Sequence, residues 1–360
     1  MDRRIFLKSS AVAAAVAALP WRATLAAEDW RTFETVTRVE ILNPSGRSIA
    51  WVPLPLAESS DWFRDLNSSW SGNASAAGIE RDGKYGARML AAEWRAGHSA
   101  PVVEVTSRFM TRDRAVDLSA PANPGLQLAA AESAFHTAPT ELIPTDGIVR
   151  KTALEVTRGA QTDVQKARAI YEWVVENTYR DPKTRGCGWG DVKSMLESGN
   201  LGGKCGDLNA IFVGLARAAG VPARDVYGVR VAPSKFGYKS LGAGTANISK
   251  AQHCRAEFFA EGYGWVPVDP ADVRKVILEE PPGKLAIDDP QVVAARRRLF
   301  GSWEMNWLAY NTGHDIALPG SSGPKLPYLM YVNAETGGER RDQLEPDTVR
   351  YSIAARELTA

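Results

Sequence analysis

Cysteine and histidine are scarce in this chain of 360 residues, which contains three of the first and four of the second. The cysteines are Cys187, Cys205 and Cys254, and no two of them have the Cys-x-x-Cys spacing. The histidines are scattered without a His-x-x-x-His pair, and no glycine-rich phosphate loop occurs. The sequence therefore predicts neither a metal site nor a bound cofactor.

Charge of one sign is not in excess either, because 43 Lys and Arg are balanced by 42 Asp and Glu, which gives a formal net charge of +1. This balance gives no electrostatic reason to expect nucleic acid or an anionic membrane surface as a partner. Hydrophobic residues make up 44% of the chain and 11 are tryptophan, which supplies a buried core and excludes a disordered protein. The length predicts two domains, or one domain with additions.

The N-terminus lacks a hydrophobic run long enough for an ordinary spanning helix. "MDRRIFLKSS" carries Arg3 and Arg4, and the apolar stretch "AVAAAVAALP" that follows is short. Together they resemble a twin-arginine export signal over residues 1–27, with cleavage near Ala26 or Ala27. We therefore expect the twin-arginine export machinery as a partner, a periplasmic mature protein and no membrane span after cleavage. The alternative is an uncleaved N-terminal anchor.

Short β-rich runs separated by turn sequences follow the signal, and helical patterns begin near Asp146. The fold class that we predict is α+β, with an N-terminal antiparallel β-sandwich before a catalytic core. The expected segments are a signal peptide at 1–27, a β-sandwich at 28–117, a linker at 118–145, a core at 146–280, and a C-terminal extension at 281–360 that packs on the core.

Several individual elements can be predicted from capping residues and periodicity. Thr162 is a suitable N-cap for a helix, and a short helix at 191–200 is expected to stop at Gly199. Residues 224–231 read as a strand. In the C-terminal part we expect a helix over 290–311 and strands at 326–332 and 349–358.

The stretch "GGKCGDLNAIFVGLARAAGVPAR" places Cys205 after two glycines, in the first turn of an apolar helix. Free backbone N–H groups and the positive end of the helix dipole favour a thiolate there, and they can receive an oxyanion. The alternative is an ordinary buried core cysteine. If Cys205 is the reactive thiol, the odd cysteine count leaves Cys187 and Cys254 as a candidate disulfide.

A nucleophilic thiol needs a histidine, and the histidine needs an orienting group. His253 begins a probable β-hairpin whose outgoing strand leads to Asp269. Because side chains alternate along a strand, Asp269 shares the face of His253 only if Arg255 pairs with Asp269. That register requires a tip of three residues (261–263) or five residues (260–264), whereas a four-residue loop would remove Asp269 from the site.

The sequence around these residues is similar to that of a known protein family. The cysteine block, followed by "HCRAEFFAEGYGWVPVDP", is similar to the bacterial transglutaminase-like family over about 162–272. The resemblance implies a papain-like core with a central helix on an antiparallel sheet. It also implies that Cys205 is the nucleophile, His253 the base and acid, and Asp269 the residue that orients the histidine. Many relatives have Trp where this chain has Arg255, and Cys254 is unusual, so we expect both to change the pocket wall.

Other polar or aromatic residues near these blocks have plainer interpretations. Asp207 is expected to be a structural carboxylate in the first helical turn, and Glu257 an ion-pair partner. Arg224 is expected to hold the fold together. Trp189, in the glycine-rich "RGCGWGD", is most simply core or cleft wall, and the alternative is a role near the oxyanion.

The resulting hypothesis is an exported cysteine hydrolase, a peptidase or amidase that forms an acyl-thioester through Cys205, His253 and Asp269. Its expected substrate is an amide in a peptide, a protein or the cell envelope. One alternative is a protein-crosslinking transglutaminase, which transfers the acyl group to an amine. Another is an inactive binding module of the cell envelope.

Overall fold

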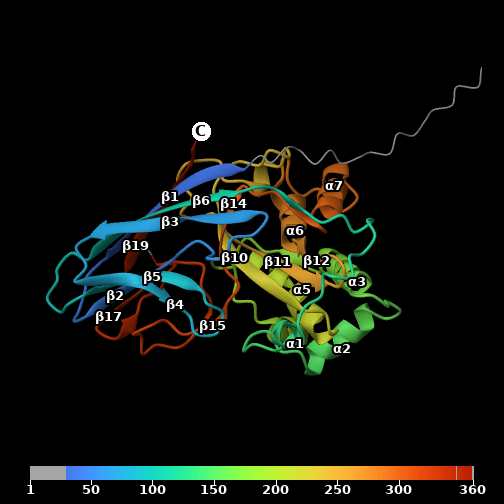
Figure 1. Ribbon diagram of the computed structural model, residues 1–360, viewed down its shortest axis with the longest axis horizontal. Helices are drawn as coiled ribbons and strands as arrows, with labels where there is room; N and C mark the ends of the chain where they lie inside the picture. The colour runs from blue at the N-terminus through green and yellow to red at the C-terminus, as the bar shows by residue number, and fades with distance from the viewer. Residues whose placement is uncertain (1–29, 346, 359–360) are drawn as a thin grey trace, which may run out of the picture.

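The computed structural model describes residues 30–345 and 347–358, so the export signal expected at 1–27 lies outside the described residues. Within the part of the chain that is described, no helix is both long and apolar enough to span a bilayer. Figure 1 shows β-sheets at one end of the molecule and helices at the other, with strands β10 and β11 between them.

The strands at one end form two antiparallel sheets that pack face to face. Their shared core contains Val39 and Val103 from the first sheet and Val52, Leu90 and Trp94 from the second. The first sheet has the order β19-β1-β6-β3, with β1 (Arg31–Ile41), β3 (Phe63–Gly72), β6 (Val102–Thr111) and β19 (Val349–Leu358). The second has the order β18-β17-β2-β5-β4, with β2 (Ser48–Pro53), β4 (Ala76–Arg81), β5 (Arg88–Trp94), β17 (Asn333–Thr336) and β18 (Glu339–Arg340). The predicted β-sandwich is therefore present.

The sandwich is completed by strands from the far end of the chain, which differs from the expected extension at 281–360. Strand β19 pairs with β1 from Thr32↔Leu358 to Ile41↔Val349, and β17 pairs with β2. Without these strands, β1 and β2 would each expose a row of unpaired backbone groups at a sheet edge. Strands β17, β18 and β19 therefore belong to the sandwich instead of packing on the core as an extension.

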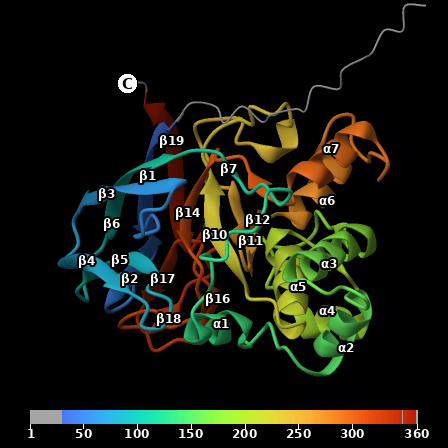
Figure 2. The same cartoon turned by 45° about the vertical axis from the view of Figure 1, so that its right-hand side comes forward.

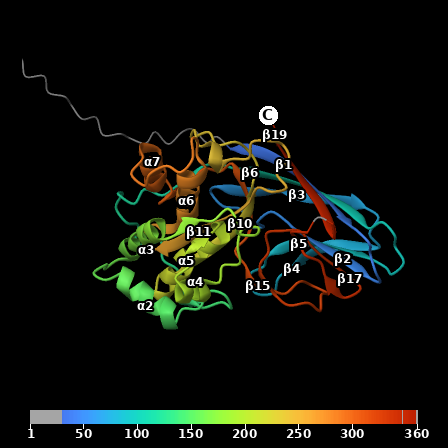
Figure 3. The same ribbon diagram turned by 180° about the vertical axis from the view of Figure 1, so that it is seen from behind.

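A third antiparallel sheet, outside the sandwich, forms the core in the order β12-β11-β10-β14. Its strands are β10 (Ala223–Arg230), β11 (Gln252–Ala260), β12 (Gly264–Val268) and β14 (Trp307–Asn311). Helix α5 (Cys205–Ala218) packs on it with every residue buried. Around α5 lie α2 (Gly147–Val156), α3 (Asp163–Asn177) and α6 (Pro270–Glu279), as Figures 2 and 3 show. The predicted α+β fold with a central helix on an antiparallel sheet is confirmed.

The sandwich and the core sheet share a hydrophobic cluster, which joins the two halves of the molecule. Phe33, Phe63 and Phe109 of the first sandwich sheet pack in one cluster with Val229 of β10 and Trp307 of β14. Because the core sheet is covered by helices elsewhere and by the sandwich here, its strands are almost entirely buried.

Local sequence explains where several helices begin and end. The Thr162 side chain accepts a hydrogen bond from the Gln165 backbone N–H at the start of α3, as predicted for an N-cap. Helix α4 (Val192–Ser198) ends at Gly199, whose φ of 69° is the left-handed conformation that glycine favours. The remaining short elements are β7 (Arg114–Ala115), α1 (Ala130–Thr137), β8 (Tyr179–Arg180), β9 (Gly202–Gly203), η1 (Lys239–Leu241), α7 (Pro290–Arg298), β13 (Ser302–Trp303), β15 (His314–Ile316) and β16 (Leu326–Tyr328).

The helix predicted over 290–311 is wrong in its second half. Helix α7 ends at Arg298, Gly301 has a φ of 109°, and β13 and β14 follow. A strand that is buried on both faces has an unbroken apolar sequence, which hydrophobic periodicity does not separate from a buried helix. The strand predicted at 326–332 is also shorter than expected, because β16 stops at Tyr328.

Candidate active site

Cys205 is the first residue of α5, with Lys204 at the N-cap, so its sulfur lies at the helix N-terminus as predicted. The turn before it is tight: the Gly206 N–H donates to the Cys187 carbonyl oxygen at 2.8 Å. A Cβ on Gly206 would lie 2.6 Å from that same oxygen, so this position excludes any larger residue. Cys205 is 4% exposed, belongs to a buried cluster with Leu208 and Tyr227, and also lines a cavity.

The β11–β12 hairpin has the register that brings His253 and Asp269 together. Pairs run from Ala256↔Val268 to Ala260↔Gly264, which leaves a three-residue tip at 261–263. The predicted odd-length tip is therefore confirmed. Asp269 follows β12 directly, and its Oδ2 lies 2.7 Å from His253 Nε2. Both residues are buried, and the four-residue loop that would have separated them does not occur.

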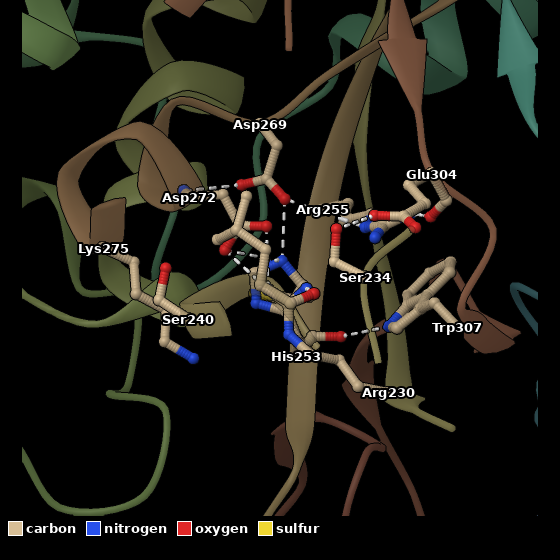
Figure 4. Close-up of polar contacts among 12 residues, drawn as sticks. Arg230, Ser234, Ser240, His253, Arg255, Asp269, Asp272, Lys275, Glu304 and Trp307 are labelled. Atoms are coloured by element: carbon tan, nitrogen blue, oxygen red, sulfur yellow. Dashed lines mark hydrogen bonds and ion pairs between the residues drawn. The ribbon is translucent and has the colours of Figure 1, made fainter. Parts of the chain in front are cut away.

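Several contacts fix the orientation of this pair (Figure 4). Asp269 Oδ1 accepts the Asp272 backbone N–H at 3.0 Å and the Asn209 side-chain amide at 3.4 Å. Its Oδ2 is thereby directed at the imidazole. The Trp307 indole N–H donates to the His253 carbonyl oxygen at 2.9 Å, which holds the backbone of the histidine. With Nε2 bonded to Asp269, the other ring nitrogen of His253 is the one available to Cys205, which lines the same cavity.

A buried ion pair next to His253 was not predicted from the sequence. Arg230 Nη2 lies 2.6 and 2.8 Å from the two carboxylate oxygens of Asp272, and Asp272 Oδ1 lies 3.5 Å from His253 Nε2. Burial favours a higher pKa for Asp272, but the Arg230 guanidinium outweighs it and holds that pKa well below its usual range. The sequence did offer one sign: Asp272 follows Asp269 at a spacing of three, which places both carboxylates in one helical turn.

Arg255, the departure from the family pattern, lies beside the site but outside its cavity. Its Nε is 3.7 Å from Asp269 Oδ2, its Nη1 donates to the Glu304 carbonyl at 2.9 Å, and it stacks on Trp307. Burial and the nearby Arg230 lower the pKa of Arg255 to about 10. Neither Arg255 nor Cys254 is among the described residues that line the cavity at Cys205, so the expectation that they change its wall is wrong.

The three cysteines form a cluster of free thiols, so the candidate disulfide between Cys187 and Cys254 is not present. All three cysteines belong to one buried cluster, and the Cys187 thiol donates to the Gln252 carbonyl oxygen at 3.4 Å. The pKa of Cys205 is lowered well below its usual value, by the hydrogen bonds from Cys187 and Cys254 first and by His253 as well, against the opposing effect of burial. The pKa of Cys187 is raised by hydrogen bonding to Cys205 and by burial, and the pKa of Cys254 is raised first by burial, so Cys205 is the thiol of the three whose ionisation is favoured.

His253 has the complementary shift. Burial and Arg230 favour a lower pKa, but Asp272 and the hydrogen-bonded Asp269 outweigh them, and the pKa of His253 is raised. A thiol whose pKa is lowered beside an imidazole whose pKa is raised favours the thiolate–imidazolium pair, the reactive form of a cysteine nucleophile.

A cavity of about 690 Å³ opens at Cys205 and His253. It is bounded by the loop that contains Asn247 and by Tyr331 and Tyr351 from the C-terminal part of the chain. Trp189 is not among the described residues that line it and is 64% exposed, so the structure does not place Trp189 in the wall of this cavity.

The residues expected to be structural do have structural contacts. Asp207 accepts the backbone N–H groups of Gly190 and Lys204, both at 3.0 Å, and so holds the loop before α5. Glu257 is buried between Arg224, at 2.6 Å, and Arg114. These interactions confirm the interpretations of Asp207, Glu257 and Arg224.

One group of side chains in the described part of the chain has the spacing of a metal site, and it is His253 with Asp269 and Asp272. Its donor atoms already have partners, because His253 Nε2 is bonded to Asp269 and both oxygens of Asp272 are bonded to Arg230. The guanidinium supplies the positive charge that a cation would supply, so these residues are better suited to proton transfer than to metal binding.

Comparisons with known proteins bear on the family and the fold of the chain. Residues 150–270 match the family model described as the transglutaminase-like superfamily. An uncharacterized protein of Haemophilus influenzae is 35% identical over 348 residues, which cover 92% of this chain and 92% of that protein.

Solved structures are similar in fold at low sequence identity. A candidate cysteine protease from Cytophaga hutchinsonii has a TM-score of 0.57 and 13% identity, with 92% of each chain covered, so the two share a fold. The periplasmic domain of TgpA from Pseudomonas aeruginosa is 14% identical over 67% of this chain and 88% of that domain. Its TM-score of 0.33 is too low to indicate a common overall fold.

Proposed function

Because the chain belongs to the family of the Haemophilus influenzae protein and contains a transglutaminase-like superfamily domain, we propose that it is a cysteine hydrolase that cleaves amide or peptide bonds. The observation that carries the proposal is the arrangement of three side chains. Cys205 lies at a helix N-terminus and lines one cavity with His253, whose Nε2 is 2.7 Å from Asp269 Oδ2. That arrangement is the one needed by a thiol nucleophile with a proton partner and an orienting carboxylate.

In the first half of the reaction, the Cys205 thiolate attacks the carbonyl carbon of the substrate. A carbon–sulfur bond forms, and the carbonyl electron pair moves to oxygen, where the Cys205 backbone N–H at the start of α5 stabilises the oxyanion. The carbon–nitrogen bond then breaks while His253 donates its proton to the leaving amine. The product is an acyl-thioester on Cys205 with a neutral imidazole beside it.

In the second half, water attacks the thioester carbonyl. His253 takes the proton of that water, the carbon–sulfur bond breaks, and the carboxylic acid leaves with the thiolate restored. Asp269 accepts a hydrogen bond from Nε2–H throughout, which keeps the opposite ring nitrogen directed at the reacting atoms and stabilises the imidazolium.

The cavity favours water over an amine as the acyl acceptor. Its lining includes Lys204, Arg230 and Lys275, and a lysine side chain that approaches as an ammonium ion meets charges of its own sign. Water has no such barrier, which argues for hydrolysis over protein crosslinking. The test is incubation with a labelled amine and a glutamine-containing protein, in which stable incorporation of the amine would overturn hydrolysis as the main reaction.

Purified mature protein should release amines from a peptide-amide library, and Cys205→Ala should abolish this release while the circular dichroism spectrum stays unchanged. Cys187→Ala is the comparison variant: it leaves the nucleophile in place and should retain turnover, at a reduced rate because hydrogen bonding by Cys187 lowers the pKa of Cys205. Equal turnover by wild type and Cys205→Ala would refute the mechanism. The binding-module alternative predicts no turnover and no unusually reactive thiol.

The paired Arg3 and Arg4 support export to the periplasm as a folded protein. Replacing both with lysine should retain the precursor in the cytoplasm, which cell fractionation measures. Unchanged delivery of the double variant to the periplasm would exclude the twin-arginine route.

A further inference from the structure

The cavity at Cys205 carries charge of one sign. Among the described residues that line it, six are Lys or Arg and none is Asp or Glu. The chain as a whole has 43 basic and 42 acidic residues, so an excess of basic residues in the protein does not explain this lining. The six cationic residues are Arg180, Arg185, Lys204, Arg230, Lys250 and Lys275.

Carboxylates behind the wall compensate only part of this charge. Arg230 pairs with Asp272, Arg185 with Asp342, and Arg180 and Lys275 share Glu279. Among the described residues, the six cations of the cavity are thus paired with only three carboxylates. Three positive charges are formally left without a compensating carboxylate.

Two of the cations have no ion-pair partner among the described residues, and these are Lys204 and Lys250. Lys204 is half-buried and directly precedes the nucleophile, whereas Lys250 is exposed in the loop that leads to His253. Lys275 is largely buried, and burial together with Arg230 lowers its pKa. Like charges held together at a partly buried site repel one another, and a bound anion relieves this repulsion.

We propose that the substrate of this site is anionic, a peptide that carries a carboxylate next to the amide bond that is cleaved. This inference rests on the proposed hydrolase function, because the anion must lie close to the acyl group that Cys205 attacks. The carboxylate comes either from an acidic side chain or from the free C-terminus of the peptide, and both have the same charge and the same acceptor oxygens. Lys204 is placed to bind this carboxylate close to the nucleophile. Lys250, which is exposed at the mouth of the cavity, is placed to bind it from the outside.

The test uses four peptides that are otherwise identical: an acidic side chain with a blocked C-terminus, a neutral side chain with a free C-terminus, a neutral side chain with a blocked C-terminus, and a lysine side chain with a blocked C-terminus. We expect kcat/KM to be about tenfold or more higher for at least one carboxylate peptide than for the neutral blocked peptide, and the advantage to shrink as salt is added. The first two peptides distinguish the two sources of the carboxylate. Equal kcat/KM for neutral and carboxylate peptides would overturn the inference and leave the hydrolase function intact.

Variants at the mouth of the cavity provide a second readout. Lys250→Glu should reduce the preference for the carboxylate peptide by about tenfold, through a change in KM and not in kcat. The same variant should raise kcat/KM for the lysine peptide. Lys193→Glu on α4 is the matched control, because Lys193 is also exposed but does not line the cavity. An unchanged preference in Lys250→Glu together with an unchanged salt dependence would count against the inference.

Binding to the inactive Cys205→Ala variant separates this inference from the proposed function. Fluorescence anisotropy with the same four peptides, labelled at the N-terminus, measures affinity without turnover. Selective binding of carboxylate peptides in the absence of any turnover by the wild type would refute the hydrolase and retain an anionic ligand. Equal binding of all four peptides would refute the anionic ligand.

Discussion

Asp269→Asn tests the role of the carboxylate with very little change in shape. The Oδ1 position of Asp269 accepts two donors, the Asp272 N–H at 3.0 Å and the Asn209 amide at 3.4 Å. An asparagine there must place its oxygen at this position, because its amide nitrogen accepts no hydrogen bond. Its NH₂ group then takes the place of Oδ2, 2.7 Å from His253 Nε2. A neutral imidazole must accept that donor at Nε2 and carry its proton on the other ring nitrogen, which faces Cys205.

The variant should therefore hold His253 in the wrong tautomer and destabilise its charged form. A hydrogen bond to a charged group contributes about 1.5–3 kcal/mol, which corresponds to about one to two pH units at 1.36 kcal/mol per unit. The carboxylate raises the pKa of His253, so removing its charge lowers that pKa. The imidazolium of the thiolate–imidazolium pair then loses its proton at a lower pH. The decline of kcat/KM on the alkaline side of the pH profile therefore begins at a lower pH. We expect kcat/KM to fall by about 10²–10⁴-fold, the range for a lost proton relay and a misplaced tautomer.

The assay is kcat/KM against pH, together with the pH dependence of alkylation by iodoacetamide without substrate. Asp289→Asn is the matched control, because Asp289 also precedes a proline and caps a helix, α7, through the Gln291 N–H at 2.8 Å. Asparagine caps helices about as well as aspartate, so both variants should keep their thermal stability. If Asp269→Asn retains the wild-type alkaline limb and activity within threefold, Asp269 does not orient His253.

Three further predictions follow from buried contacts. At mildly acidic pH, iodoacetamide should label Cys205 in the native protein but neither of the other cysteines, and mass spectrometry showing equal labelling of all three would contradict the assigned thiolate. Arg230→Gln leaves Asp272 buried without its partner and should lower the free energy of unfolding by about 3–5 kcal/mol, measured by urea denaturation; an unchanged midpoint would show that the pair contributes nothing. Deleting β19 (Val349–Leu358) opens the edge of β1, so light scattering should detect aggregation, and a monomeric, folded truncation would contradict this reasoning.

The helix position of Cys205 and the pairing of His253 with Asp269 could be predicted from local rules, whereas the approach of Cys205 to His253 was implied by the family resemblance. Two glycines and an apolar helical pattern fix the site of the cysteine. Because side chains alternate along a hairpin, Asp269 lies on the same face as His253 only if the tip has an odd number of residues. The glycines at 262 and 264 adopt the positive φ angles that a tight tip requires. No contact between distant segments had to be guessed for this pair.

Other contacts at the site join segments that no sequence rule connects. Arg230 reaches Asp272 across 42 positions, and Cys187 reaches Cys205 through a loop whose path depends on several positive-φ glycines. The odd cysteine count suggested one disulfide and one free thiol, but it carries no information on distance. Three thiols at one site instead allow two of them to stabilise the thiolate of the third, a hydrogen-bonding role that the count alone does not reveal.

The closure of the sandwich by the chain's last strands changes what determines specificity at the site. Tyr331 and Tyr351 line the cavity together with Cys205, and Tyr351 lies on β19, the partner of β1. The core sheet and α5 supply the reacting side chains, whereas part of the substrate wall comes from the sandwich. A relative that keeps the core but replaces the sandwich should therefore keep the chemistry and change its substrate. Within this chain, substitutions at Tyr351 should alter KM between peptides and change the alkylation rate of Cys205 little, because the Tyr351 hydroxyl accepts a hydrogen bond from the Gln252 side chain at 3.4 Å, and neither residue is among the groups that lower the pKa of Cys205 by hydrogen bonding.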